Sequence, residues 1–111
     1  MTMLRENQTA VVARNEWWAD GDASEPYEAG WASEAMVFLR ALDAQGEGGR
    51  AVVQVSPDGL RWVDEGTRFD APDRGQVAFA RVREFGQWLR VRMELPKGRR
   101  VKVLLTYNLK S

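Results

Sequence analysis

Apolar and polar residues alternate with a period of two along much of this 111-residue chain, as they do in β-strands that bury one face. The alternation is clearest in residues 50–64, where two such runs flank Pro57, Asp58 and Gly59. Proline fixes its own φ, aspartate bonds nearby backbone amides, and glycine tolerates positive φ. We therefore predict a β-hairpin with strands at residues 50–56 and 60–64. Its structural turn is made by Ser56, Asp58, Gly59 and Trp62.

Two later stretches, residues 87–95 and 101–109, place an apolar side chain at every second position. The rows predicted to face a core are Leu89, Val91, Met93 and Leu95 in the first stretch, and Val101, Val103, Leu105, Tyr107 and Leu109 in the second. Truncating one of these large side chains should cost about 2–4 kcal/mol of stability.

Shorter alternating runs predict further strands at residues 9–14, 34–43, 67–69 and 76–82. Residues 34–43 contain several good helix formers, so a helix is the alternative there. Residues 76–82 alternate without indicating which face is buried. Glycine, proline and charged residues predict loops at residues 45–49, 70–75 and 96–100.

Seven or eight short strands separated by regular turn signals predict an all-β fold, an antiparallel β-sandwich of the jelly-roll form. The length is that of one domain, which we place at residues 9–111. Residues 1–8 are polar and have no period, so we expect a flexible N-terminal arm that becomes ordered against a neighbour.

The composition restricts the chemistry. The chain has no His and no Cys, which removes the usual catalytic triads and most metal sites, so we expect neither an enzyme nor a cofactor. The formal net charge is zero, so we do not expect nucleic acid as the main partner. No apolar run reaches the length of a membrane span, and the N-terminal residues lack a signal pattern. We therefore expect synthesis in the cytoplasm and no membrane partner.

Charge is unevenly distributed along the chain. Residues 1–34 carry a net charge of −5, residues 35–80 a net charge of −2, and residues 81–111 a net charge of +7. Two solvated ends of opposite sign are one interpretation. The other is a pair of complementary surfaces that meet in a head-to-tail or cyclic assembly.

The stretch 15–30 is acidic, rich in aromatic residues, and predicted to be a surface loop or a partly stranded excursion. Its carboxylates at Asp20, Asp22 and Glu25 are a calcium candidate, although their spacing matches no EF-hand loop and we predict no metal site. Trp17 and Trp18 are adjacent, so in a strand one would enter the core and the other would face outward.

The order of elements over residues 35–109 resembles the galactose-binding-like β-sandwich group, which includes discoidin-type and carbohydrate-binding modules. It more closely resembles small stand-alone β-sandwich proteins of bacteriophage virions, through VVQVSPDGLRW, FGQWLRVRMEL and VKVLLTYNL. This resemblance implies a self-associating head decoration or tail protein, incorporated in a virion with copies of itself and other virion proteins as partners.

The same resemblance gives an alternative function, a carbohydrate-binding module in which an exposed tryptophan stacks on a sugar ring. One candidate platform is Trp88 with Arg90, Arg92 and Glu94. The other combines Trp17 or Trp18 with Tyr27 and nearby carboxylates. The alternative for Trp88 is a sheet face covered by a loop or a neighbouring subunit, and the outward tryptophan of the pair is an equivalent candidate for contact with a partner.

Overall fold

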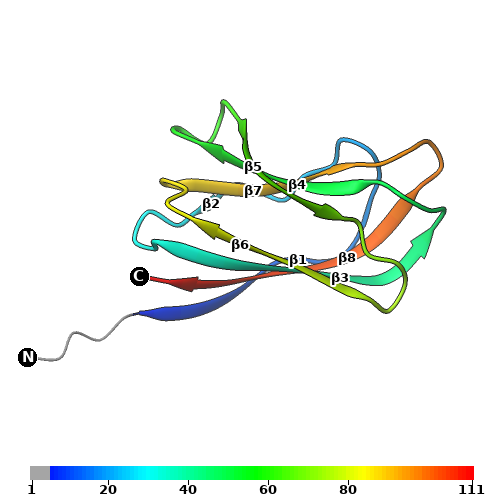
Figure 1. Ribbon diagram of the computed structural model, residues 1–111, viewed down its shortest axis with the longest axis horizontal. Coiled ribbons are helices and arrows are strands. Elements are labelled where there is room, and N and C mark those ends of the chain that lie inside the picture. The colour runs from blue at the N-terminus through cyan, green and yellow to red at the C-terminus, as the bar shows by residue number, and fades with distance from the viewer. Residues whose placement is uncertain (1–5) are drawn as a thin grey trace, which may run out of the picture.

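The computed structural model describes residues 6–111, which fold into two stacked four-stranded antiparallel sheets without a helix (Figure 1). The sheet orders are β1-β8-β3-β6 and β2-β7-β4-β5. The eight strands are β1 (Asn7–Trp18), β2 (Tyr27–Glu28), β3 (Glu34–Gln45), β4 (Arg50–Ser56), β5 (Val63–Asp70), β6 (Val77–Arg83), β7 (Trp88–Glu94) and β8 (Arg100–Lys110).

These two strand orders are those of a jelly roll, so the predicted fold class is confirmed. Among the described strands, β4 and β5 are the one consecutive pair that remains in a single sheet. Every other connection crosses between sheets. The predicted hairpin is therefore the local element of a fold that otherwise pairs distant segments.

The core lies between the sheets and contains both predicted apolar rows. Every side chain of those rows is buried, with 6% exposure or less. The Tyr107 hydroxyl lies 3.4 Å from the Ser24 hydroxyl, whose oxygen accepts the amide of Val91 at 3.0 Å. Burial raises the pKa of the Tyr107 phenol, and the Ser24 hydrogen bond partly offsets this effect.

Residues 34–43 form a strand, as predicted, and the helix alternative is wrong. Strand β3 pairs with β8 on one side and with β6 on the other. Its inward side chains Ala35, Val37, Leu39 and Ala41 are buried. This alternating burial and two-sided pairing outweigh the intrinsic helix preference of its residues.

Strand β1 is longer than the predicted strand at residues 9–14. A β-bulge at Asn15, which has a φ of 57°, inserts one residue into the strand. Pairing with β8 resumes after the bulge and extends the strand to Trp18. Asparagine is among the non-glycine residues that most readily adopt this conformation. At the other end, Asn7 and Gln8 pair with Lys110 and Leu109. The rest of the predicted arm, apart from Glu6, lies outside the described residues.

The hairpin β4–β5 is confirmed, but its second strand begins at Val63 rather than at residue 60. Leu60 is 81% exposed at the tip of the turn. Residues 63–64 of the first predicted strand and residues 67–69 of the second belong to one strand, which has a bulge opposite Val53. The turn is held by Asp58 Oδ1, which accepts the amides of Leu60 at 2.8 Å and Arg61 at 2.9 Å.

Arg99 is buried at the end of the sandwich, with 2% exposure. Its guanidinium donates to the carbonyls of Gly46 at 2.8 Å, Gly48 and Pro72 at 3.1 Å and Ala71 at 3.4 Å. It also donates to Asp73 Oδ1 at 3.1 Å. One side chain in the predicted basic turn thus joins the β3–β4 and β5–β6 loops.

Candidate functional site

The outer surface of sheet β2-β7-β4-β5, here the β7 face, carries one of the predicted sets of site residues. Trp88, Arg90, Arg92 and Glu94 project from β7 in a half-buried row. Arg90 Nε donates to Gln54 Oε1 at 2.8 Å, and Gln54 Nε2 donates to Asp64 Oδ1 at 2.8 Å. The Glu94 carboxylate forms ion pairs with Arg50 at 2.7 Å and with Arg92 at 3.7 Å. Arg92 and Glu94 are therefore ion-paired within the molecule, and Arg90 is hydrogen-bonded to a neutral amide.

The aromatic side chains of the β7 face are in contact with neighbouring groups. The Arg90 guanidinium lies 4.3 Å from the centroid of the Trp62 ring. The Trp88 ring packs on the turn at Gly59, where an added Cβ would lie 3.3 Å from a ring carbon. Burial lowers the pKa of Arg90, and Arg92 lowers it further. One ring face of each tryptophan is occupied, and sugar binding here stays a prediction.

The other predicted aromatic set does not come together as one platform. Trp18 is buried in the core at 3% exposure. Trp17 lies on the opposite side of β1, with the Arg100 guanidinium 4.7 Å from its ring centroid. Tyr27 packs edge-on against Tyr107, with ring centroids 5.5 Å apart. The expected split of the tryptophan pair is confirmed, because the two side chains point to opposite faces of the strand.

Two of the three calcium candidates, Asp20 and Asp22, use their carboxylates as backbone hydrogen-bond acceptors. Asp20 Oδ1 accepts the amide of Leu95 at 3.0 Å, and Asp22 Oδ2 accepts the amide of Ala19 at 2.8 Å. Glu25 is exposed. In residues 6–111, no three His, Cys, Asp or Glu side chains are grouped so as to hold a metal ion.

The outer surface of sheet β1-β8-β3-β6, here the β3 face, was not singled out from the sequence. Antiparallel partners project on the same side, so the register sets four rows across this face. These rows are Asn7, Lys110, Glu34 and Arg83; Thr9, Asn108, Met36 and Arg81; Val11, Thr106, Phe38 and Phe79; and Arg14, Leu104, Arg40 and Val77. An apolar centre is thus flanked by basic residues.

Three large apolar side chains at the centre of the β3 face are exposed to solvent. Phe79 is 51% exposed, Val77 56% and Val11 48%. Phe38 and Phe79 contact each other with ring centroids 6.4 Å apart, and the Arg81 guanidinium lies 5.5 Å from the Phe79 ring centroid. Clustered exposure of this kind marks interaction surfaces more often than scattered single side chains do.

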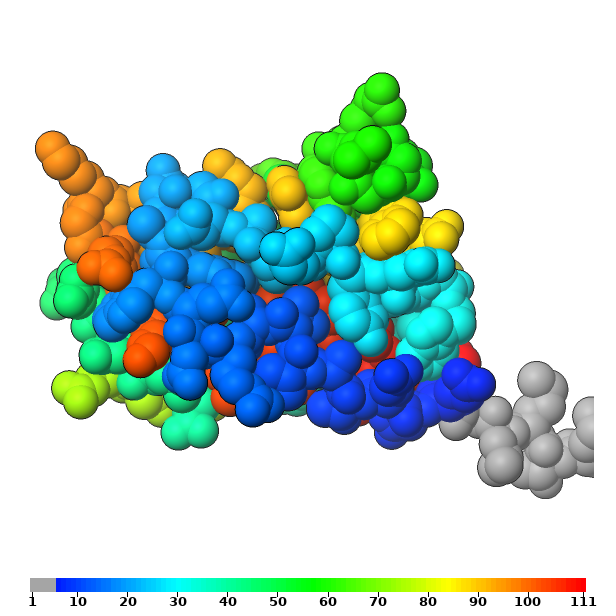
Figure 2. All heavy atoms as spheres, turned by 180° about the vertical axis from the view of Figure 1, so that it is seen from behind, coloured from blue at the N-terminus to red at the C-terminus, as the bar shows by residue number. Residues whose placement is uncertain are grey.

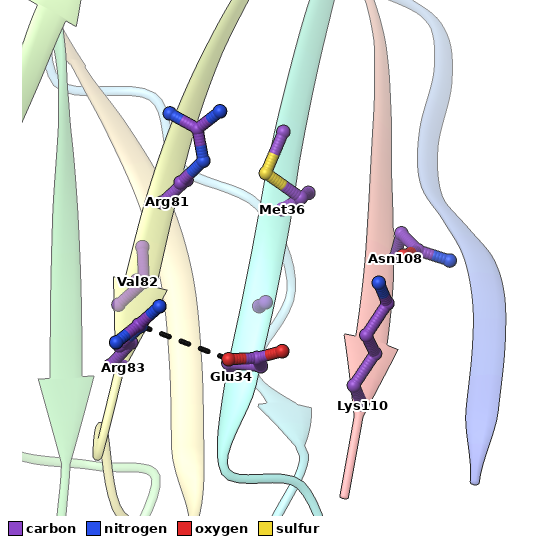
Figure 3. A pocket seen from close by; sticks show the side chains of 8 residues that line it. Glu34, Met36, Arg81, Val82, Arg83, Asn108 and Lys110 are labelled. Carbon is purple, nitrogen blue, oxygen red and sulfur yellow. Dashed lines mark ion pairs between the residues drawn. The ribbon is translucent and has the colours of Figure 1, made fainter. Parts of the chain in front are cut away.

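A shallow depression of about 150 Å³ lies at one end of the β3 face (Figure 3). Arg81, Arg83 and Lys110 surround it, and Arg83 pairs with Glu34 at 3.7 Å. A second depression of about 200 Å³ lies beside the hairpin, between Val63 and Phe85. Both are smaller than the roughly 300–1,000 Å³ of small-molecule sites. The basic depression fits a single carboxylate side chain better than a whole ligand.

The alternation of residues 76–82 did not indicate which of its two rows of side chains is buried. For this reason the β3 face could not be predicted from the sequence. The register answers the question, because Ala80 and Val82 face the core while Phe79 and Arg81 face outward. The available signal was the size of the side chains. Small residues at every second position indicate a tightly packed inner face, and the aromatic residue at the alternate position is then left outside.

Comparison of the sequence with known protein families and with curated proteins found no match. Among solved structures, the crystal structure of SPBc2 prophage-derived protein YomS is similar, with a TM-score of 0.67 and 8% sequence identity. The likeness covers 100% of this chain and 98% of that chain. It extends the resemblance to phage β-sandwich proteins at the level of fold. No helix within residues 6–111 is long and apolar enough to cross a bilayer.

Proposed function

We propose that this protein is a non-enzymatic, self-associating structural component of a phage particle, a head decoration or tail protein built on a jelly roll. Copies of the chain and other virion proteins are its partners, and it enters the virion after synthesis in the cytoplasm. The β3 face is the observation that carries this proposal. It combines exposed Phe79, Val77 and Val11 with basic residues that no ion pair within the described part of the chain neutralises, Arg40 and Arg81.

The contrast between the two outer faces supports this choice of surface. On the β7 face, Arg90, Arg92 and Glu94 have partners in their own molecule. On the β3 face, the apolar centre is uncovered and the basic side chains outnumber the carboxylates. Burying such a face against another protein surface removes apolar area from water, which is the main driving force of association. The full-length likeness to a prophage-derived protein agrees with a phage setting.

The solution mass of the full chain tests this proposal. Light scattering coupled to size exclusion, at about 1–100 μM protein, should give a mass above that of the monomer. Replacing Phe79, which is 51% exposed at the centre of the face, with serine should weaken association at least about tenfold, because one large buried side chain contributes about 1.5–3 kcal/mol.

Leu60→Ser is the matched control. Leu60 is 81% exposed but lies on the hairpin tip, away from the β3 face. Its substitution removes a similar apolar side chain and should leave the mass unchanged. A wild-type chain that stays monomeric over the whole concentration range would contradict the proposed function.

A further inference from the structure

We propose that the β3 face of one copy binds the acidic segment 16–28 of the next copy in a head-to-tail contact. This inference rests on the proposed self-association and names the second surface involved. It is carried by complementary charge, by exposure and by the separation of the two surfaces within one molecule.

The acidic surface is continuous in sequence and in space. The chain has no Lys or Arg from residue 15 through residue 39. In this interval, five carboxylate side chains are exposed: Glu16, Asp20, Asp22, Glu25 and Glu28. Segment 19–28 lies along strand β7, where Gly21 and Ser24 donate backbone hydrogen bonds to Met93 and Val91. Trp31, 38% exposed, follows this segment in the chain and offers an apolar side chain for an apolar partner surface.

The basic surface has the opposite composition. The four rows of the β3 face contain five basic side chains, Arg14, Arg40, Arg81, Arg83 and Lys110, and one carboxylate, Glu34. The depression between Arg81 and Lys110 has the size and charge to receive a glutamate or aspartate side chain (Figure 3). The exposed Phe79 beside Arg81 provides the apolar contact.

The two surfaces lie on different sides of the molecule. Strands β5 and β6 lie next to each other at one edge of the sandwich, so β1 and β2 lie at the other edge. Figure 2 shows the blue to cyan part of the chain, from residue 6 onward, spread over one side of the protein. The acidic segment begins in the edge strand β1, which also carries Arg14 of the β3 face, and continues along strand β7 of the opposite sheet. The carboxylates of residues 20–28 therefore lie on the opposite sheet from the arginines of β3 and β6, and a second copy can bring the two sets together.

A symmetric face-to-face dimer of β3 faces is disfavoured, because it would bring five basic side chains against five others. The head-to-tail contact instead pairs opposite charges at every interface. Each copy then retains one free surface of each kind, so the contact repeats until a ring closes or a filament grows. The formal net charge of zero adds no overall repulsion between copies.

Charge reversal tests the contact. The first variant, Arg40→Glu with Arg81→Glu, reverses the two arginines that flank the Phe38–Phe79 pair. The second, Glu25→Lys with Glu28→Lys, removes most of the negative charge of the acidic segment. Each should weaken self-association at least about tenfold at about 100 mM salt, measured by sedimentation velocity and light scattering. An equimolar mixture of the two should form heterodimers and no larger species, since the unchanged acidic segment of the first variant can still bind the unchanged β3 face of the second.

The control variant Arg68→Glu with Lys97→Glu changes net charge by the same amount as the first variant but lies outside both surfaces. It should assemble as the wild type does, and circular dichroism should show that all three variants are folded. A wild-type oligomer that neither surface variant weakens would overturn this inference and leave self-association intact. Failure of the mixture to form heterodimers would also overturn it.

A wild-type monomer at every concentration would overturn both this inference and the proposed function. If such a monomer bound a duplex DNA oligonucleotide and lost it in the Arg40→Glu, Arg81→Glu variant, the β3 face would be assigned to phosphates instead.

Discussion

At the scale of single residues, Arg99 illustrates how far a charged side chain can depart from the surface position its type suggests. It is 2% exposed and donates to four carbonyl oxygens and one carboxylate. The planar guanidinium places its donors in fixed directions, so it reaches carbonyls of two loops at once. Sequence reasoning could not identify it, because Arg99 stands beside the exposed Arg100 in a run that reads as a basic turn.

The substitution Arg99→Lys should lower the free energy of unfolding by about 2–4 kcal/mol, as measured by urea denaturation. Lysine keeps the charge but cannot reach both loops, so several buried carbonyls lose their donor. The neighbouring substitution Arg100→Lys is the control and should change stability by less than about 0.5 kcal/mol. Equal effects of the two substitutions would show that Arg99 does not join the loops.

The Asp58 carboxylate should make the stability of the hairpin turn depend on pH. The amides of Arg61 and Leu60, with side-chain hydrogen bonds from Ser56 and Arg61, lower its pKa from the usual 3.8 to about 2. Because the folded-state pKa is the lower one, the carboxylate stabilises the turn above pH 3.8 and its contribution is lost as the pH falls through about 2.

Wild type and Asp58→Asn should therefore differ most in unfolding midpoint near about pH 6 and converge near about pH 2. The measurement is urea denaturation of both proteins across this range. A difference that stays constant with pH would mean that the Asp58 charge has no part in holding the turn.

At the scale of elements, alternation predicted the strands well where one face is buried and the other is exposed. Strands β7 and β8 show this, since every inward residue of their two predicted rows is buried. The pattern failed at bulges. In β1, Asn15 inserts a residue without ending the strand, so the alternation changes phase and the remaining residues read as a loop. In β5, a similar irregularity divided one strand into two predicted ones.

The two faces of β8 allow a matched test of this interpretation. Leu105→Ala removes a fully buried side chain between the sheets and should cost about 2–4 kcal/mol of stability. Leu104→Ala removes the same atoms from the half-buried outer side and should cost less than about 1 kcal/mol. Comparable losses, measured by thermal or urea unfolding, would contradict the inner and outer assignment.

At the scale of the whole molecule, the sequence indicated the sandwich and the uneven charge but not where the charges lie. Which strands are neighbours depends on connections that pass from one sheet to the other. The local sequence pattern directly indicates only the pairing of the β4–β5 hairpin. The β3 face exists because four strands from distant parts of the chain align Val11, Phe38 and Phe79 in one row. The charge-reversal experiment tests the arrangement of the whole fold, because its outcome depends on surfaces that form only when distant strands pair.

The position of β8 also determines when the sheet β1-β8-β3-β6 can form during synthesis. It lies between β1 and β3 and joins them through backbone hydrogen bonds along its length. Until residues 100–110 leave the ribosome, β1 and β3 have no strand between them, and most of one sheet stays unformed. The β4–β5 hairpin can form early, but one sheet of the sandwich must wait. In the nascent chain, the inward apolar side chains of β1 and β3 therefore remain exposed until β8 pairs with both strands.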